Sequence, residues 1–203
     1  MYTPAPFVHS GPPEAIDAFI ERHSFGALVS YRADRGLAVT HLPFLVDRQT
    51  RRLFTHLAKA NPHWQHFEEA GEATAVFSGE HGYVSPAWYA SPLAVPTWNY
   101  EAVHVTGTVR ILDADALRTR MAELVTTNEA HREQPWHFPT DERYGRYLDQ
   151  MMTGIVGLEI DMSRIEGKRK LSQNRSVEDQ QAIIEALNAS GRATDRALAE
   201  RMR

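Results

Sequence analysis

The chain has 203 residues, of which 42% are hydrophobic and 24% charged, and its formal net charge is −4. This composition is typical of a soluble globular protein, and the length favours one domain. The absence of cysteine excludes disulfides, cysteine-ligated metal centres and thiol nucleophiles. No apolar run reaches the roughly 20 residues that a membrane-spanning helix needs, and no signal peptide is recognisable. We therefore expect a cytoplasmic protein with no membrane partner.

Hydrophobic periodicity in the first part of the chain predicts a β-meander preceded by a helix. The helix follows a Pro-Pro pair, and Pro43 places a bend or a sheet edge within the second strand. The pair Asn61-Pro62 starts a short helix, because proline is favoured at the first helical position. The expected elements are a helix over 14–23 and strands over 25–31, 37–46, 52–57 and 73–79.

The second part of the chain alternates strands with capped helices. Asp113 and Ser176 are each expected to cap a helix, and Gly191 to end the later one. The expected elements are an irregular loop over 80–96, a strand over 97–112, helices over 113–128 and 141–152, a strand over 154–162 and a helix from 176. Five or six strands that mostly follow one another predict an α+β, mainly β, antiparallel barrel with flanking helices.

Charge is unevenly distributed along this chain. Residues 163–203 carry nine basic and six acidic side chains, whereas residues 1–162 carry 13 basic and 20 acidic ones. A domain that binds along DNA is usually basic as a whole. DNA binding is therefore weakly supported, and its only candidate is the C-terminal helix, the pair Ser190-Gly191 and the short arginine-rich segment that follows.

The common catalytic motifs are absent. The chain has ten histidines, and His63 and His66 share a face of the short helix, but no acidic partner stands at a metal-binding spacing. A surface or interface pair is therefore favoured over zinc. No nucleophile elbow, P-loop or dinucleotide fingerprint occurs. We assign no metal ligand and no catalytic residue.

Residues 55–62 are the best candidate for phosphate binding, because a strand end leads into a helix N-terminus there. The first N–H groups of a helix are unpaired and favour an anion. Lys59 is one of only three lysines, against 19 arginines, and its compact ammonium suits a phosphate oxygen. An ordinary surface lysine is an equally good interpretation.

Two further segments are candidates for ligand contact. Residues 79–100 are dense in aromatic side chains, which indicates either a packed structural loop or dimer contact, or a surface for a flat aromatic ligand. Residues 167–175 are basic and rich in amide donors. They could meet a phosphate or the polar edge of a cofactor, or form a solvated charge run.

Taken together, these segments resemble a known family. The motifs are MYTPAPF, HLPF, HLAKANPHW, GYVSPAWY, VPTWNYEAVHVTG, GIVGLEI and GKRKLSQNR, in that order. They are similar to the PaiB-type proteins, described as FMN-binding negative transcriptional regulators. The resemblance covers about residues 1–188, which would form an FMN-binding split-barrel domain. Residues 189–203 carry no signature and would form a basic C-terminal tail.

The resemblance implies a six-stranded antiparallel split β-barrel with flanking helices, a class that includes pyridoxamine 5′-phosphate oxidases and flavin reductases. It also implies a homodimer with FMN bound at the interface by both chains. Glu80 and Gly82 depart from the usual pattern, which puts the local loop shape in question. The cofactor-binding residues that the resemblance implies are His56, Lys59 and Asn61 near the phosphate, Tyr83, Ser85, Trp98 and Asn99 near the ring, and Lys170, Gln173 and Asn174.

Two functions follow from the resemblance. The family description implies negative transcriptional regulation, acting directly or indirectly through flavin binding. The alternative is an FMN-dependent oxidoreductase, either an NAD(P)H:flavin reductase or an oxidase of a small substrate, in which the cofactor carries the chemistry. Whether the protein is an enzyme is left open at this point.

Overall fold

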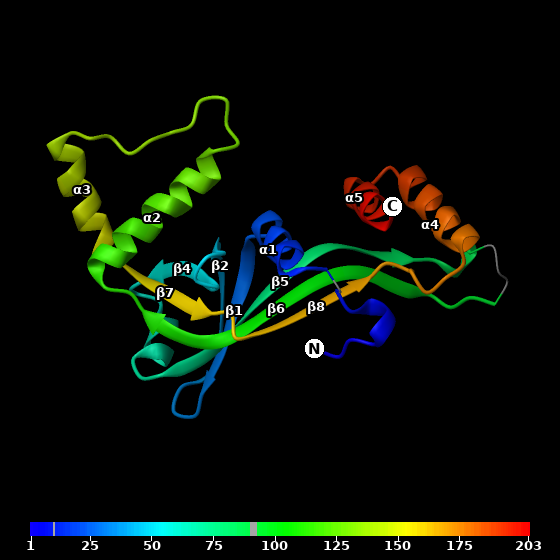
Figure 1. Cartoon of the computed structure of the whole chain (residues 1–203), viewed down its shortest axis with the longest axis horizontal. Helices are drawn as coiled ribbons and strands as arrows, with labels where there is room; N and C mark the ends of the chain where they lie inside the picture. The colour runs from blue at the N-terminus through cyan, green and yellow to red at the C-terminus, as the bar shows by residue number, and fades with distance from the viewer. Residues whose placement is uncertain (10, 90–92) are drawn as a thin grey trace. The chain divides into compact units, whose positions relative to one another are not determined.

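Figure 1 shows the computed structural model, which describes residues 1–9, 11–89 and 93–203. Eight strands lie in this part of the chain: β1 (Phe25–Arg32), β2 (Gly36–Pro43), β3 (Leu45–Asp47), β4 (Arg52–Ala58), β5 (Gly71–Val84), β6 (Thr97–Ile111), β7 (Ile155–Asp161) and β8 (Arg164–Lys170). The α-helices are α1 (Pro13–Arg22), α2 (Ala114–Glu129), α3 (Glu142–Met152), α4 (Val177–Ala189) and α5 (Ala193–Met202). Three short 3-10 helices are η1 (Ala5–Phe7), η2 (Pro62–Phe67) and η3 (Pro86–Trp88).

The chain divides into two compact units. The first unit comprises Met1–His23, Phe77–His104 and Glu166–Arg203, and the second comprises Ser24–Val76 and Val105–Ile165. The long strands β5 and β6 contribute residues to both. Among the described residues, no helix is both long enough and apolar enough to cross a bilayer.

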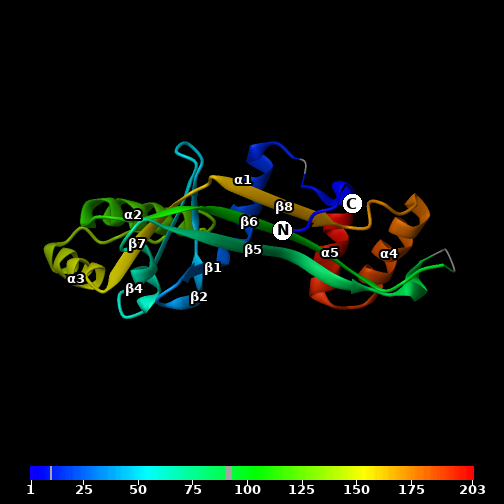
Figure 2. The same cartoon turned by 90° about the horizontal axis from the view of Figure 1, so that it is seen from below.

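The eight strands of the described residues are hydrogen-bonded in the order β2-β1-β5-β6-β7-β4-β3, and β8 pairs with β6. The β1–β2 and β4–β7 pairs are antiparallel and can be followed in Figure 2. Their registers run from Phe25↔Pro43 to Arg32↔Gly36 and from Arg52↔Asp161 to Ala58↔Ile155. The expected α+β class, with an antiparallel sheet and flanking helices, is confirmed.

The described part of the chain has eight strands rather than the six expected. The segment 37–46 is not one strand: β2 ends at Pro43 and β3 begins at Leu45, and the two lie at opposite ends of the strand order. The basic run that begins at Arg164 forms β8, which the hydrophobic pattern does not reveal. Proline cannot donate to a sheet ladder, which is consistent with the end of β2 at a sheet edge.

One glycine in the second unit is required by close packing. A Cβ added to Gly107 on β6 would lie 1.7 Å from the carbonyl oxygen of Asp161 at the end of β7. No side chain can be accommodated at that distance without moving one of the strands. The tight approach of these strands therefore depends on Gly107.

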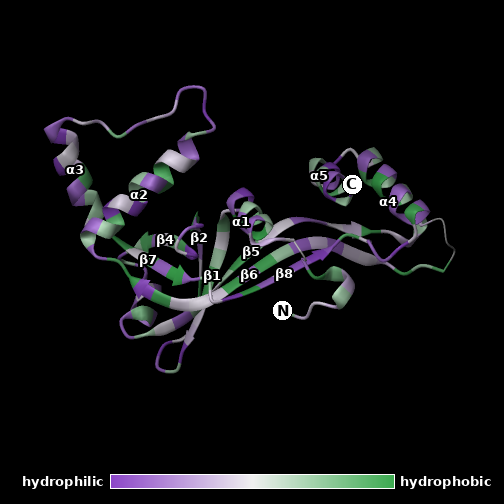
Figure 3. Cartoon of the chain, in the orientation of Figure 1, coloured by the Kyte–Doolittle hydropathy of each residue, from purple (hydrophilic) through white to green (hydrophobic). Residues whose placement is uncertain are grey.

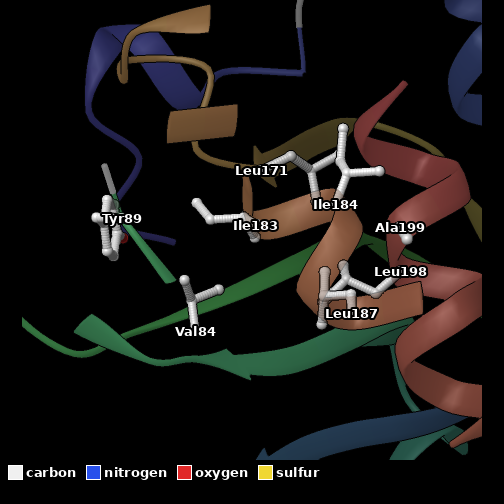
Figure 4. Close-up of a cluster of buried hydrophobic side chains, with 8 residues drawn as sticks. All are labelled: Val84, Tyr89, Leu171, Ile183, Ile184, Leu187, Leu198 and Ala199. Atoms are coloured by element: carbon white, nitrogen blue, oxygen red, sulfur yellow. The ribbon is translucent and has the colours of Figure 1, made fainter. Parts of the chain in front are cut away.

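The hydrophobic core of the first unit lies beneath α4 and α5. Figure 4 shows the side chains that form it, which come from β5, the segment after η3, the residue that follows β8 and the two helices. Ile183, Ile184 and Leu187 are buried on one side of α4, as predicted, and Figure 3 shows hydrophobic and hydrophilic residues on different sides of this helix. Residues Leu198 and Ala199 of α5 complete the cluster. The segment 189–203 therefore contains a helix that packs in the core of this unit.

The predicted helix caps are present. The side chains of Asp113 and Ser176 accept hydrogen bonds from the backbone N–H groups of Ala116 and Asp179, and Gly191 follows α4 with φ +77°. This positive φ favours glycine and ends the helix. Local side-chain chemistry thus sets these three boundaries.

The predicted loop over 80–96 requires correction. Its first five residues continue β5 to Val84, and a short 3-10 helix follows after Ser85. Residues 90–92 of this predicted loop lie outside the described residues. The aromatic density of the segment masked a regular strand, because His81 and Tyr83 occupy alternate positions that point to the exposed side of β5.

Candidate functional site

The phosphate candidate lies in the second unit, directly after β4. The backbone N–H of Lys59 donates to the carbonyl oxygen of Gly154 over 2.8 Å, and the Trp64 indole N–H donates to the Lys59 carbonyl over 2.9 Å. These bonds fix the backbone of the turn and leave the Lys59 side chain exposed. Among the described residues, its ammonium makes no hydrogen bond or ion pair. Lys59 is therefore available to bind an anion.

The helix after this turn differs from the expectation. It is η2, a 3-10 helix of six residues, and its cap is already occupied. The Asn61 side-chain oxygen accepts from the His63 N–H over 3.0 Å, and the Asn61 amide nitrogen donates to the Thr40 hydroxyl over 3.2 Å. A short, capped 3-10 helix offers little for an anion. Charge recognition at this turn therefore depends on the Lys59 ammonium.

His56 precedes the turn on β4 and is half-buried beside Phe54, with ring centroids 6.4 Å apart. Its Nδ1 atom is buried and has no hydrogen-bond partner among the described residues. Burial lowers the pKa of His56, so the imidazole is neutral at pH 7. Buried polar atoms are rarely left without a partner, and this one is a candidate for contact with a ligand.

His63 and His66 form a buried cluster, so the predicted surface or interface pair is wrong. The Ser30 hydroxyl lies 2.9 Å from His63 Nε2 and 2.8 Å from His66 Nδ1, and the Thr40 hydroxyl lies 2.8 Å from His63 Nδ1. Burial, reinforced by the charge of His66, lowers the pKa of His63 to about 4. Because η2 packs on β1 and β2, the shared face of the two histidines points into the unit.

The aromatic candidates lie in the first unit on the exposed side of β5 and β6. His81 stacks on Trp98 with ring centroids 6.0 Å apart and an interplanar angle of 24°, and Tyr83 meets Trp98 edge-on at 6.3 Å. Tyr83 is 47% and Trp98 49% exposed. Large aromatic side chains that remain half exposed on a sheet often mark a surface for a ligand or partner. We call His81, Tyr83 and Trp98 the aromatic surface.

Two of the residues expected near a flavin ring have internal roles. The Ser85 hydroxyl caps η3 by accepting from the Ala87 N–H over 3.3 Å. Asn99 is fully buried, and its amide nitrogen donates to the Ser172 hydroxyl over 2.9 Å and contacts the Met202 sulfur at 3.6 Å. Either residue would have to exchange an existing hydrogen bond to contact a ligand.

The KLSQN segment borders the aromatic surface. Lys170 donates to the Trp98 carbonyl over 2.7 Å and also to the Thr97 hydroxyl. Burial, followed by the charges of Lys168 and Arg175, lowers the pKa of Lys170. Gln173 accepts from the Leu171 N–H over 2.7 Å, and Asn174 is exposed. Through Lys170, the segment is thus hydrogen-bonded to the backbone of Trp98.

The ten predicted cofactor residues fall into the two units. His56, Lys59 and Asn61 lie within six consecutive residues of the second unit, between the end of β4 and the start of η2. The other seven belong to the first unit, where the aromatic surface and the KLSQN segment adjoin through Trp98. Each unit therefore presents its own candidate surface.

One group near the aromatic surface was not predicted. Lys168 is buried on β8, its ammonium lies 5.1 Å from the centroid of the Tyr100 ring, and it donates to the Tyr2 carbonyl over 3.1 Å. A cation held over aromatic rings is favourable when it is shielded from water. The rarity of lysine in this chain is the available sequence signal for a special role. It indicates Lys59 and the basic run, but it does not distinguish Lys168 from Lys170.

Comparison with known proteins gives one family match and one full-length relative. The family described as "Putative FMN-binding domain" matches residues 1–164. The chain is 34% identical over 206 residues to the "Protease synthase and sporulation protein PAI 2" of Bacillus subtilis, an alignment that covers 100% of this chain and 96% of that protein.

Solved structures with the same fold are more distant in sequence. The FAD and heme binding protein from Mycobacterium smegmatis matches with a TM-score of 0.62 at 14% identity, covering 85% of this chain and 78% of that chain. The flavocytochrome Anf3 from Azotobacter vinelandii matches with a TM-score of 0.61 at 13% identity, covering 84% and 73%. At this identity the likeness concerns the fold alone, and it agrees with the split-barrel class that the motifs imply.

Proposed function

Because the chain belongs to the family described as "Putative FMN-binding domain", we propose that it binds FMN as a homodimer and acts as a negative transcriptional regulator. The observation that carries the cofactor proposal is the aromatic surface, where Tyr83 and Trp98 are half exposed. An isoalloxazine ring is flat and partly apolar, and it stacks well on such side chains. FMN would supply redox chemistry and a visible absorbance to the protein.

The proposed roles follow from which donors remain available. Lys59 binds the phosphate as a free ammonium, and His56 contributes its unpartnered Nδ1 atom. Tyr83 and Trp98 contact the ring, Lys170 donates to the Trp98 carbonyl, and exposed Asn174 supplies a further polar group. Asn61, Ser85, Asn99 and Gln173 belong to the proposed set through hydrogen bonds that hold these segments in place.

A flavin titration tests the cofactor. FMN fluorescence should be quenched on binding, with saturation at micromolar concentrations of protein. Lys59→Ala should weaken binding by about 1–3 kcal/mol, the typical value of a charge-assisted hydrogen bond. Arg143→Ala removes an exposed cation on α3 and serves as the matched control. Equal affinity of the two variants would reject the role of Lys59, and no binding by the natural protein would reject the cofactor.

The aromatic surface has an independent test. Trp98→Ala should weaken FMN binding and should also change the flavin absorbance band, because the ring loses a stacking partner. Trp136→Ala removes a tryptophan of similar exposure in the second unit and is the control. A flavin spectrum that is identical in the natural protein and in Trp98→Ala would contradict contact with the ring.

The homodimer is proposed from the same resemblance. Sedimentation equilibrium of the FMN-loaded protein should give twice the mass of the 23.0 kDa chain. A monomer at micromolar concentration would overturn this part of the proposal without affecting the flavin titration. The two results are therefore separable.

The regulatory role is proposed to act indirectly, through flavin binding. Three of the four arginines in the C-terminal segment that is the DNA-binding candidate already have partners. Arg192 lies 3.8 Å from Asp195, Arg196 donates to the Gly191 carbonyl, and Arg201 pairs with buried Glu101. A gel-shift assay on the region upstream of the protein's own operon, at low and at 200 mM salt, should show no specific band. A specific shift that survives the higher salt would establish the direct mode instead.

A further inference from the structure

The first unit contains a cavity of about 730 Å³, and among the described residues that line it only Gln173 belongs to the proposed flavin-contact set. Its walls come from the N-terminal segment, one side of α1, the end of β8 and the last turn of α5. Small-molecule sites in proteins usually measure roughly 300–1,000 Å³. The cavity is therefore large enough for a metabolite.

Positive charge dominates the wall. Arg22, Arg169, Arg201 and Arg203 line the cavity, and no acidic side chain is among the lining residues. Two carboxylates stand behind the wall, because Glu101 pairs with Arg169 and Arg201, and Glu80 lies 3.8 Å from Arg201. Four guanidinium groups thus face two carboxylates, which leaves an excess of positive charge.

The buried carboxylate of Glu101 holds two of these arginines in fixed positions. Arg201 donates through Nε over 2.7 Å and through Nη2 over 3.1 Å, and Arg169 Nε lies 3.3 Å from the same carboxylate. A guanidinium has five N–H donors in a rigid fork. The Nη1 groups of both arginines remain without a partner among the described residues, so preoriented donors are available for an oxyanion.

Arg22 and His9 add groups that are not engaged. The Arg22 side chain is exposed at the end of α1 and makes no hydrogen bond or ion pair among the described residues. His9 packs edge-on against Phe19 at 6.3 Å, and its Nδ1 is buried without a hydrogen-bond partner in the described part of the chain. Burial lowers the pKa of His9, so this nitrogen is a neutral polar contact.

Much of the remaining wall is apolar, with Gln173 and Gln180 as further polar members. Phe19 of α1, Leu171 after β8 and Met202 of α5 line the apolar part, together with the small side chains of Ala15 and Ala18. An inorganic anion alone would leave these apolar side chains without a partner. The combination of fixed arginines with an aromatic and aliphatic wall suits a ligand that has both an acidic group and an apolar body.

We propose that this cavity binds a small organic anion, with a carboxylate or phosphate group at Arg22, Arg169 and Arg201 and an apolar body on Phe19, Leu171 and Met202. The site is distinct from the proposed flavin site, with which it shares only Gln173. The inference does not rest on FMN binding. It gives the protein a second ligand, whose binding links the N-terminal segment and α1 to the C-terminal helix α5 of the same unit.

Calorimetric titration of the full-length chain, first without FMN and then with FMN in excess, tests the proposal. The probes are 3-phenylpropionate, phenyl phosphate, the neutral 3-phenylpropanamide and inorganic phosphate alone. At least one of the two aromatic anions should bind, and should do so at least tenfold more tightly than the neutral amide and than inorganic phosphate. Phenyl phosphate and 3-phenylpropionate distinguish the two acidic groups. Loss of their binding when FMN is added would place them in the flavin site and overturn the proposal.

Two variants address the cavity itself. Arg22→Gln removes a cation that has no structural partner, and it should weaken binding of the anionic probe by about tenfold. Ala18→Phe fills the cavity from an exposed position of α1 and should abolish binding with an unchanged circular dichroism spectrum. Arg143→Gln is the matched control and should bind as the natural protein does. Equal binding in all three variants, or equal affinity for the neutral amide, would overturn the proposal.

Discussion

The buried histidine cluster of the second unit predicts a loss of stability in mild acid. His63 is only 3% exposed, and both of its ring nitrogens are held by hydroxyl groups of Ser30 and Thr40. Its pKa is about 4 in the folded protein, against about 6.5 in an unfolded chain. The folded state therefore binds fewer protons. The stabilisation is fully present above pH 6.5 and is lost as the pH falls toward 4.

The expected magnitude follows from these two pKa values. At pH 5, an unfolded histidine is almost fully protonated, whereas His63 in the folded protein remains largely neutral. Proton linkage then gives a loss of about 2 kcal/mol between pH 7 and pH 5 from this residue. For a urea slope of about 2 kcal/mol/M, this loss lowers the unfolding midpoint by about 1 M.

The measurement is urea unfolding at pH 7 and pH 5, followed by circular dichroism. His63→Gln keeps a donor near Ser30 but cannot titrate, so its stability should fall less between the two pH values, by about 2 kcal/mol. The histidines outside the cluster that have lowered pKa values act equally in both proteins and cancel in this comparison. They are His9, His23, His56 and His104. His66 shares the Ser30 hydroxyl with His63, so the difference between the two proteins measures the cluster as a unit.

An exposed histidine provides the control. His137→Gln removes a titratable group outside the cluster and should reproduce the pH dependence of the natural protein. If His63→Gln lost as much stability between pH 7 and pH 5 as the natural protein does, the cluster would not carry a depressed histidine pKa. The interpretation of His63 as a neutral buried partner of Ser30 would then be refuted.

Three substitutions test packing, capping and close approach. Leu187→Ala removes a fully buried side chain of α4 and should lower the free energy of unfolding, measured in urea, by about 2–5 kcal/mol. A decrease below 1 kcal/mol would contradict the place of Leu187 in the core. Asp113→Ala removes the cap that accepts from Ala116 and should cost about 1 kcal/mol, which a midpoint unchanged within error would disprove. Gly107→Ala places a methyl group against the Asp161 carbonyl and should prevent soluble expression or lower the melting temperature by about 10 °C or more. Normal melting of Gly107→Ala would show that the strands can separate there.

Local chemistry explains what could be predicted from the sequence. Asp113 and Ser176 cap their helices through bonds to residues three positions away, so the signal and the structure lie in the same short segment. The alternation of apolar and polar residues from Val103 to Ile111 likewise predicts a strand with one apolar face, and this segment lies within β6. Such features depend on neighbours along the chain.

Strand β8 shows why a strand can escape prediction. The residue that points into the unit at its centre is Lys168, which is buried beneath Tyr2 and Tyr100. A lysine at an inward position removes the apolar alternation on which strand prediction depends. The aromatic partners lie about 70 and 170 residues away in sequence, so the compensation is visible only in three dimensions.

The division of the segment 37–46 into two strands has a similar cause. Pro43 correctly marks an interruption, but the residues on its two sides belong to strands with different partners. β2 pairs with β1, whereas β3 pairs with β4 at the other end of the strand order. Nothing within the segment distinguishes a bent strand from two strands with different partners. The outcome is decided by which neighbouring strand each half can pair with.

At the candidate phosphate turn, the structure changes the physical basis on which Lys59 is predicted to bind an anion. The prediction relied on unpaired N–H groups at a helix start, but Asn61 caps η2 and also bonds to Thr40. Among the described residues from Lys59 to His66, the Lys59 ammonium is then the only charged donor without a partner that could bind an anion. An exposed ammonium attracts anions through a screened interaction, so affinity at this turn must be strengthened by a second, less exposed group. We propose that this group is His56, which lies three residues earlier in the chain on β4 and has a buried ring nitrogen without a partner among the described residues.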